Sequence, residues 1–343
     1  MIEKILKKQI PNLLNNADFW QQEKLPISKS RLWALYHNPE SDDDDVVLYY
    51  FKKNGIIESY LCIYHFWWNY QEKSIKLGAA SAWYSSDQAK GMGFFIMREA
   101  LQDLDGNFIS HMFNYHVKEL YDASREFQTI QEMTGFTYTF QHDGFFKTKN
   151  NKKLESEIQQ KLVSDQIEIE YVNYVDDELY TFIQKNSANH FYPKSKDYFN
   201  WLLNYRWVLE SPVQEIEVKN KYFFSTTVSN YGLYAIKILK KGTLDGFLIF
   251  SVFESKLKIY LYYAQDEIKL TSIVKKLVSL FVLRLKCKEV HCYDNILNHT
   301  FVQDRFYKNY TQSKKLSIMH KKFEIENLKN CHLNYGDGDC IFT

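Results

Sequence analysis

The clearest hydrophobic pattern in this chain runs from residue 74 to residue 104, where an alternating stretch leads through a glycine turn into a helical stretch. From Ile75 to Trp83 the side chains fall into two alternating sets, which is typical of a strand. The apolar positions that follow recur at the spacing of one helical face, at Gly93, Met97, Ala100, Leu101 and Leu104. The sequence therefore predicts a strand that turns directly into a helix.

The same patterns predict the other elements of the first half. Two strands, at residues 46–52 and 56–64, flank the hairpin signal Lys53-Asn54-Gly55. The elements expected after residue 104 are a strand at 108–114, a helix at 118–133 and a closing pair of strands at 136–140 and 144–149.

The second half repeats this order of elements. The pattern predicts four strands, then a helix and a further strand, at 222–228, 233–239, 246–253, 256–263, 269–285 and 290–294. We interpret the repeat as an internal duplication. A polar, basic stretch at Lys147–Lys153 marks the expected boundary, which gives domains at residues 1–150 and 151–343.

The turn at Gln88–Gly93 has the chemistry of an anion-binding loop. A glycine turn that feeds a helix leaves backbone N–H groups without partners at the helix start, where the helix dipole favours negative charge. Glycines allow φ > 0 and a close approach of the anion, and Lys90 adds a positive charge. From spacing alone, an ordinary turn between a strand and a helix is the alternative to a phosphate or pyrophosphate site.

Three landmarks in order resemble the GNAT family of N-acyltransferases. Gln88-x-x-Gly91-x-Gly93 resembles the family's Q/R-x-x-G-x-G/A coenzyme A loop, and Phe108–Asn114 resembles its next strand, which often ends in asparagine. Thr134-Gly135-Phe136 resembles the "GF" ahead of its last strands. The resemblance covers about residues 45–147. It implies an α+β (mixed α/β) fold of two tandem GNAT-like domains, each a mostly antiparallel twisted central sheet flanked by helices.

The resemblance also implies which residues hold acetyl-CoA as cosubstrate. Main-chain N–H groups around Trp83 and Tyr84 would polarise the thioester carbonyl in the manner of an oxyanion hole. Asn114 would contact the pantetheine or the tip of the site. The loop residues expected to bind the coenzyme are Gln88, Ala89, Lys90, Gly91, Met92 and Gly93.

The proton acceptor and donor are less well marked. The candidate bases near strand ends are Glu58, His65, His116 and Asp45, and an ordered water is an alternative. The family's usual tyrosine, four residues before "GF", is replaced here by Gln131. Tyr115 and Tyr121 are the candidates to substitute for it, and we take Glu58, His116 and Tyr115 as the predicted catalytic residues.

The second half departs from the coenzyme motif. At the matching position it has Ala264-Gln265-Asp266-Glu267-Ile268, with no glycine and with two carboxylates that would repel a pyrophosphate from a helix start. We therefore expect no coenzyme site there. The second half is expected to complete the acceptor site or to stabilise the first half.

Composition narrows the class of protein. The net charge is +1, so there is no basic excess for nucleic acid, and no apolar run approaches the ~20 residues that a membrane span needs. Five cysteines without a C-x-x-C pair favour a reduced, cytoplasmic protein. The cluster Cys331-His332 with Asp337, Asp339 and Cys340 fits no standard zinc spacing, so no metal is expected.

These observations favour one function and leave two alternatives. The first is an acyltransferase that moves acetyl from acetyl-CoA to an amine of a small molecule or amino sugar by direct attack. The alternatives are a non-catalytic acyl-CoA or metabolite-binding module, and an aminoacyl transferase of the FemAB kind that uses charged tRNA. The acceptor and the oligomeric state stay open.

Overall fold

A computed structural model gives the structure of residues 1–22, 24–70, 73–114, 117–141, 145–187, 190–205, 207–210, 227–228, 230–324 and 333–338. The first half contains β1 (Ile2–Leu6), η1 (Lys7–Gln9), α1 (Ile10–Leu14), α2 (Ala17–Trp20), α3 (Lys29–Tyr36), β2 (Val46–Lys53), β3 (Ile56–Tyr70), β4 (Lys73–Ser85), η2 (Asp87–Ala89), α4 (Met92–Asp103), β5 (Phe108–Asn114), α5 (Lys118–Ser124) and β6 (Phe127–Thr139). Helix α6 (Phe145–Ser164) follows and leads into the second half.

The second half contains β7 (Ile167–Tyr171), α7 (Asp177–Lys185), α8 (Lys196–Asn204), β8 (Leu209–Glu210), β9 (Thr227–Val228), β10 (Tyr231–Lys240), β11 (Thr243–Phe253), β12 (Lys256–Ala264), α9 (Glu267–Arg284), β13 (Glu289–Cys292), α10 (Asn295–Val302), η5 (Arg305–Tyr307) and β14 (Tyr310–His320). Most of the predicted strand at 222–228 lies outside the described residues. The other strands predicted in this half, and its helix, are confirmed to within a few residues.

Twelve of the described strands form one continuous sheet, in the order β1-β2-β3-β4-β5-β14-β6-β13-β12-β11-β10-β7. Neighbouring strands are antiparallel except for two pairs, β4 with β5 and β12 with β13, which are parallel. Each parallel pair is connected through a helix, α4 in the first half and α9 in the second, as parallel pairing requires. The sheet therefore consists of two similar units, each mixed but mostly antiparallel. This confirms the predicted internal duplication.

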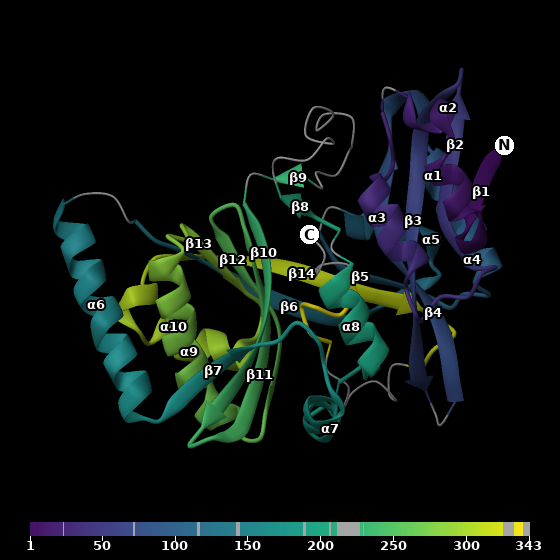
Figure 1. Ribbon diagram of the computed structural model, residues 1–343. Coiled ribbons are helices and arrows are strands. Elements are labelled where there is room, and N and C mark those ends of the chain that lie inside the picture. The colour runs from purple at the N-terminus through teal and green to yellow at the C-terminus, as the bar shows by residue number, and fades with distance from the viewer. Residues whose placement is uncertain are drawn as a thin grey trace.

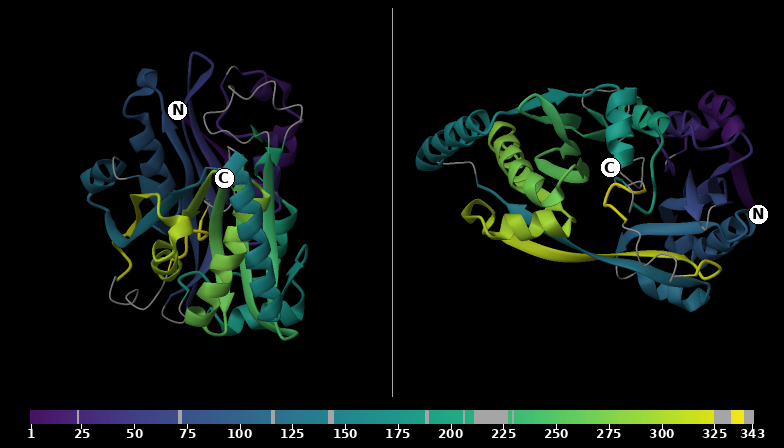
Figure 2. Two further views of the ribbon diagram at one scale, coloured as in Figure 1. Left: turned by 90° about the vertical axis from the view of Figure 1, so that its left-hand side faces the viewer. Right: turned by 90° about the horizontal axis from the view of Figure 1, so that it is seen from below.

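The two halves exchange strands at the centre of the sheet. Strand β14, near the end of the chain, lies between β5 and β6, and β6 pairs with β13 of the second half. The right-hand view of Figure 2 shows the yellow strand β14 running from the second half across to the first. Residue 150 lies within α6, so the division into domains 1–150 and 151–343 stays a prediction.

Helices cover both faces of the sheet. Helix α4 packs on one face of the first half through Ile96, Met97, Ala100 and Leu101, while α6, α9 and α10 cover the outer face of β10–β13 (Figure 1). Helix α8 lies between the halves, where its buried Phe199 and Trp201 belong to a core shared with β3 and β12. In the described part of the chain, no helix is long and apolar enough to cross a membrane.

Two predicted elements of the first half, a helix and a strand, are wrong in part or in whole, as is the expected place of the Gly135-Phe136 landmark. The strand predicted at 136–140 is confirmed, to within a residue, as the end of β6. The helix expected at 118–133 ends at Ser124, because Arg125 adopts a left-handed conformation with φ of 59° and caps it. Strand β6 then begins at Phe127, so Thr134-Gly135-Phe136 lies inside a strand that pairs on both sides and not ahead of the last strands. The predicted strand 144–149 falls in α6 from residue 145 onward.

Candidate active site

The glycine turn has the predicted strand–turn–helix setting. Strand β4 ends at Ser85, η2 forms a single turn, and Gly91 stands at the N-cap of α4 with φ of 89°. A Cβ built on Gly91 would meet nothing within 4 Å. Glycine is therefore required there for its left-handed backbone and not for space.

Gly93 is required for a different reason. A Cβ at Gly93 would lie 2.9 Å from Trp83 Nε1 and 3.3 Å from Ser85 Cβ. The Trp83 indole also donates a hydrogen bond to the Gly93 carbonyl, at 3.2 Å. The missing side chain thus lets the first turn of α4 rest directly on β4, which fixes the direction in which the helix start points.

Side chains of neighbouring strands hold the loop in place. Ser85 Oγ donates to the Ala89 carbonyl at 2.9 Å, and Lys53 Nζ of β2 donates to the Gln88 carbonyl at 3.0 Å. Lys90 is exposed on the same loop. The Phe94 and Phe95 N–H groups donate to the Gly91 carbonyl at 3.1 and 3.4 Å, so the donors left to face a ligand are those of Met92 and Gly93. The helix dipole and two nearby lysine charges favour an anion at the same place.

Strands β4 and β5 diverge beside this loop. They pair only at Gly78–Phe108, Ala79–Ile109 and Ala80–Ser110. The next residue, Ser81, is the extra residue of a bulge in β4, and β5 continues to Asn114 paired with β14 on its other edge. Trp83 and Tyr84 lie on the part of β4 beyond this point, which pairs with β3 alone among the described strands.

The structure places Tyr84 and Glu58 at the edge of the loop. Ser59 Oγ donates to the Tyr84 carbonyl at 3.0 Å, and burial raises the pKa of the Tyr84 phenol. Glu58 accepts from the Ser86 hydroxyl through its carboxylate and from the Ser86 N–H through its carbonyl, the latter at 2.8 Å. Glu58 therefore lies next to the loop, with its carboxylate already bonded.

The other predicted catalytic residues are only partly visible. Tyr115 and His116 lie outside the described residues. Asn114 ends β5 and is paired with Lys315 of β14 through the backbone. Their roles stay predictions, as do those assigned to Gln88, Ala89 and Met92.

His65 and Asp45 form a closed network away from the loop. His65 is 2% exposed, its Nε2 is 2.8 Å from the Val46 carbonyl, and its Nδ1 is 4.0 Å from Asp45 Oδ2. Burial lowers the pKa of His65, and Asp45 is also bonded to Lys76 Nζ at 3.0 Å. Because His65 is enclosed, it has no access to a substrate in this structure.

Tyr121, the other tyrosine considered as a proton donor, packs against the diverging part of β4. It lies on α5, 2% exposed, with its ring centroid 5.6 Å from that of Trp83. Burial raises the pKa of Tyr121 to about 12, so its phenol stays protonated at neutral pH. Gln131, in contrast, lies in β6 and bonds the backbone of Leu333 at both N and O.

Sequence reasoning missed Arg31. It lies on α3, is 2% exposed, and donates to the side chain of Ser81, the bulge residue of β4. Its guanidinium carbon is 4.3 Å from the centroid of the Trp207 ring. No local pattern singles out Arg31, because its contacts lie 50 residues or more away along the chain.

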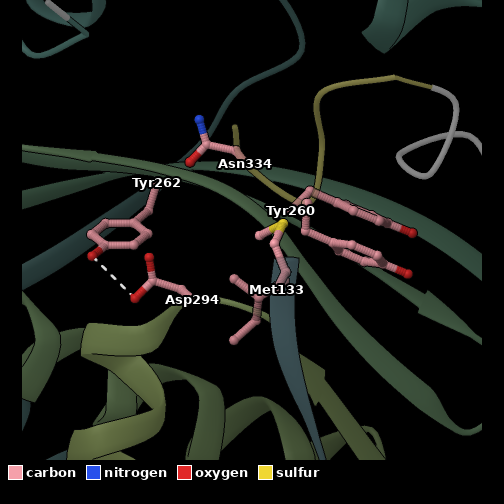
Figure 3. Close-up of a pocket in the computed structure, with 7 residues that line it drawn as sticks. Met133, Tyr260, Tyr262, Asp294 and Asn334 are labelled. Carbon is pink, nitrogen blue, oxygen red and sulfur yellow. Dashed lines mark hydrogen bonds between the residues drawn. The ribbon is translucent and has the colours of Figure 1, made fainter. Parts of the chain in front are cut away.

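The second half lacks this arrangement. Asp266 caps α9 by accepting from the Lys269 N–H at 3.1 Å, so the helix start is already bound to the chain's own carboxylate. A small pocket lies near the pairing of β12 and β13, where Tyr262 donates to Asp294 at 3.4 Å (Figure 3). Its lining comprises Met133, Ile259, Tyr260, Tyr262, Asp294, Asn334 and Tyr335.

Of the cluster Cys331, His332, Asp337, Asp339 and Cys340, only Asp337 lies within the described residues. Asp337 is buried and paired with Lys194. Within the described residues, no group of three or more His, Cys, Asp or Glu side chains could hold a metal ion.

This chain resembles several known proteins in its fold. No family model and no curated protein matches the chain. Among solved structures, a GCN5-related N-acetyltransferase from Anabaena variabilis superposes with a TM-score of 0.51 at 11% identity, covering 93% of this chain and 71% of the other. The Saccharomyces cerevisiae N-myristoyltransferase with bound myristoyl-CoA gives 0.51 at 9% identity, covering 93% and 82%.

A third structure, a conserved protein of unknown function from Enterococcus faecalis described as a probable N-acyltransferase, gives a TM-score of 0.51 at 12% identity. It covers 96% of this chain and 73% of its own. At these identities the likeness concerns the fold, which spans both halves of the chain.

Proposed function

We propose that this chain, whose fold is that of the GNAT N-acetyltransferases in two tandem units, transfers an acetyl group from acetyl-CoA to an amine. The acceptor would be a small molecule or an amino sugar. The observation that carries the proposal is the start of α4, where Gly91 and Gly93 present the first turn of the helix beside the diverging strands β4 and β5.

Coenzyme binding would depend on backbone donors and charge. The N–H groups at the start of α4 would donate hydrogen bonds to the pyrophosphate, with Gly91 providing the left-handed turn. Lys53, held against the Gln88 carbonyl, and Lys90 would add positive charge. The pantetheine would lie along the part of β4 that holds Trp83 and Tyr84, with Asn114 at the end of β5.

The reaction would proceed by direct attack of the amine on the thioester carbonyl. A C–N bond forms, the C–S bond breaks, the ammonium proton passes to a base and the coenzyme thiolate takes up a proton. Main-chain N–H groups of β4 near Trp83 would stabilise the oxyanion. Glu58 is the proposed base among the described residues, with His116 and Tyr115 as the further catalytic candidates.

A non-catalytic acyl-CoA-binding module is the second candidate. The observation that favours it is that each described candidate for proton transfer is already engaged or enclosed. Glu58 is bonded to Ser86, His65 is buried against Val46, and Tyr121 is buried against Trp83. Coenzyme binding without acyl transfer to any amine in a broad panel would favour this candidate over the enzyme.

The proposed setting is the cytoplasm, without nucleic acid as a partner. In support, Cys62, Cys287 and Cys292 are buried and form no disulfide in the described part of the chain. The net charge of +1 argues against the tRNA-dependent alternative, because RNA binding usually shows a basic excess.

Thermal unfolding with and without acetyl-CoA tests the coenzyme site. At 100 times Kd the ligand adds ~2.7 kcal/mol to the free energy of unfolding. In a chain of this size that is a rise in Tm of at least about a degree or two. The substitution Gly91→Glu places a carboxylate at the proposed pyrophosphate site, so it is expected to abolish the rise.

Gly242→Glu is the matched control. Gly242 also has a positive φ, of 75°, with open space around its Cβ position, but it lies in the hairpin between β10 and β11. The control carries the same backbone strain and is expected to retain the rise in Tm. An unchanged rise in the Gly91→Glu variant, or no rise in the folded wild-type protein, contradicts the proposed site.

A further inference from the structure

The segment Leu333–Gly338, which we call the C-terminal segment, lies against the diverging strands of the second half. Strands β12 and β13 pair from Lys256–Glu289 to Lys258–His291, and Tyr260 is then the extra residue of a bulge. The Gly336 N–H donates to the carbonyl of this same Tyr260, at 3.2 Å. The chain itself thus occupies the position that corresponds to the free part of β4.

The fit on β12 is close. A Cβ on Gly336 would lie 2.9 Å from Leu261 Cγ and 3.0 Å from Tyr260 Cβ. The Tyr335 ring stacks on Tyr260 and on Tyr293, with centroid distances of 5.5 and 4.4 Å. Figure 3 shows Asn334 and Tyr260 at this place, where the segment passes over β12.

The same segment is bonded to strands of the first half. Gln131 of β6 donates to the Leu333 carbonyl at 3.2 Å and accepts from the Leu333 N–H at 3.0 Å. His111 of β5 has Nε2 2.9 Å from the Asn334 carbonyl and Nδ1 2.7 Å from Ser317 Oγ. Since a carbonyl can only accept, Nε2 carries the proton and the Ser317 hydroxyl donates to Nδ1.

A buried ion pair anchors the last residues of the C-terminal segment. Lys194 and Asp337 are bonded, with side chains 0% and 3% exposed. The other Asp337 oxygen accepts from the Asn334 N–H at 2.7 Å, and the Asp337 N–H donates to the Asn334 carbonyl at 3.0 Å. Breaking a buried ion pair is costly, so the Lys194–Asp337 pair holds Asp337 in place. The two bonds between Asp337 and Asn334 then keep the segment in a turn conformation.

His111 stands at the point where β5 leaves β4. The last pair between these strands is Ala80–Ser110, and His111 follows directly. Met112, the next residue, has φ of 59°, which is unusual for a side chain of this kind. His111 and Met112 together stand opposite Ser317 of β14, where the register of that pairing shifts.

We propose that the C-terminal segment fixes the place where β4 and β5 diverge, with Gln131 and His111 as positioning residues. We call it a strut because it is held on β12 and in turn holds β5 and β6. The segment is held on β12 by its close fit, and it holds β5 through His111 and β6 through Gln131. The expectation that a loosened segment weakens acyl-CoA binding rests on the proposed function. The expectation that it loosens strands β4 and β5 does not depend on that function.

Two variants loosen the segment without touching the proposed coenzyme loop. Gln131→Leu keeps a similar volume and removes both hydrogen bonds to Leu333. Gly336→Val places methyl groups where Tyr260 and Leu261 already lie. Gln128→Leu is the matched control, because Gln128 lies on the same strand and donates to the carbonyl of Phe323, outside the segment.

Amide hydrogen exchange is the first measurement. Exchange at residues 81–85 and 108–114 is expected to accelerate roughly two- to thirty-fold in both variants, the range typical of remote coupling. The control is expected to match the wild type there. The affinity for acetyl-CoA, measured by calorimetry, is expected to fall by a similar factor.

The two measurements separate the proposals. Wild-type exchange rates in both folded variants overturn the strut. If exchange accelerates but the wild-type protein binds no acetyl-CoA, the strut stands and the proposed function fails. If exchange accelerates in the control as well, the effect belongs to β6 in general, and the strut is again overturned.

Discussion

At the scale of single residues, some positions of the site are determined by the local sequence and others by contacts with residues far away along the chain. Gly91 needs a left-handed backbone between a strand and a helix, which the sequence alone predicts. Gln131 and Arg31 owe their places to partners 202 and 50 residues away, and no local pattern encodes those contacts. The place of Glu58 near a strand end follows from the pattern, whereas its bond to Ser86, 28 residues away, has no local signal.

His111 leads to a prediction for pH dependence. Its unfolded pKa is 6.5, and burial lowers the folded pKa to about 4. Between these values the unfolded chain binds more protons, so stability is complete above pH 6.5 and falls as the pH drops toward 4. The contribution is about 1.4 kcal/mol per pH unit.

Urea unfolding of the wild type and of His111→Gln at pH 7.5 and 5 checks this. The wild type is expected to lose about 2 kcal/mol more than the variant over that interval. Both proteins keep His65, whose pKa is also lowered by burial, so it cancels in the comparison. Equal losses would mean that folding does not lower the pKa of His111.

At the scale of elements, strand β6 is where the hydrophobic pattern and the structure disagree. Its exposed and buried positions alternate irregularly, with a register shift near Ile130, so the sequence was open to interpretation as a helix. What makes it a strand is the need to pair with β13 and β14, both of which come from the second half. The outer hairpins, in contrast, pair with neighbours in sequence and were predicted correctly.

Gly135 tests the packing of β6. A Cβ there would overlap the Tyr293 ring, which rests directly on the strand. Gly135→Ala is therefore expected to lower the free energy of unfolding by about 1–3 kcal/mol, the usual cost of overpacking. Thr129→Ala, an exposed change on the same strand, is expected to have little effect. Urea midpoints of the two variants check this, and equal midpoints would contradict the packing.

At the scale of the whole molecule, the two halves share both a sheet and a core. The exchange of β6 and β14 joins them through backbone hydrogen bonds, and one buried cluster contains residues of α3, β3, α8 and β12. The duplication could be predicted from the order of elements. The exchange could not, because each half on its own offers a plausible strand for its own sheet.

A shared sheet predicts one cooperative unfolding transition. Hydrogen exchange in rising urea, followed separately in α4 and α9, is expected to give the same midpoint for both helices, since neither half keeps a complete sheet when the other unfolds. Two separate midpoints, with one helix protected after the other has exchanged, would show that the halves unfold independently.

The place of β14 also sets the order in which the molecule can be assembled. Strands β5 and β6 have no common neighbour until Tyr310–His320 has been synthesised. Until then a nascent chain presents one unpaired edge of β5, and β6 lacks a partner on both edges until β13 is made as well; such edges are templates for aggregation. The first half, although translated first, therefore completes its sheet only when β14 is in place.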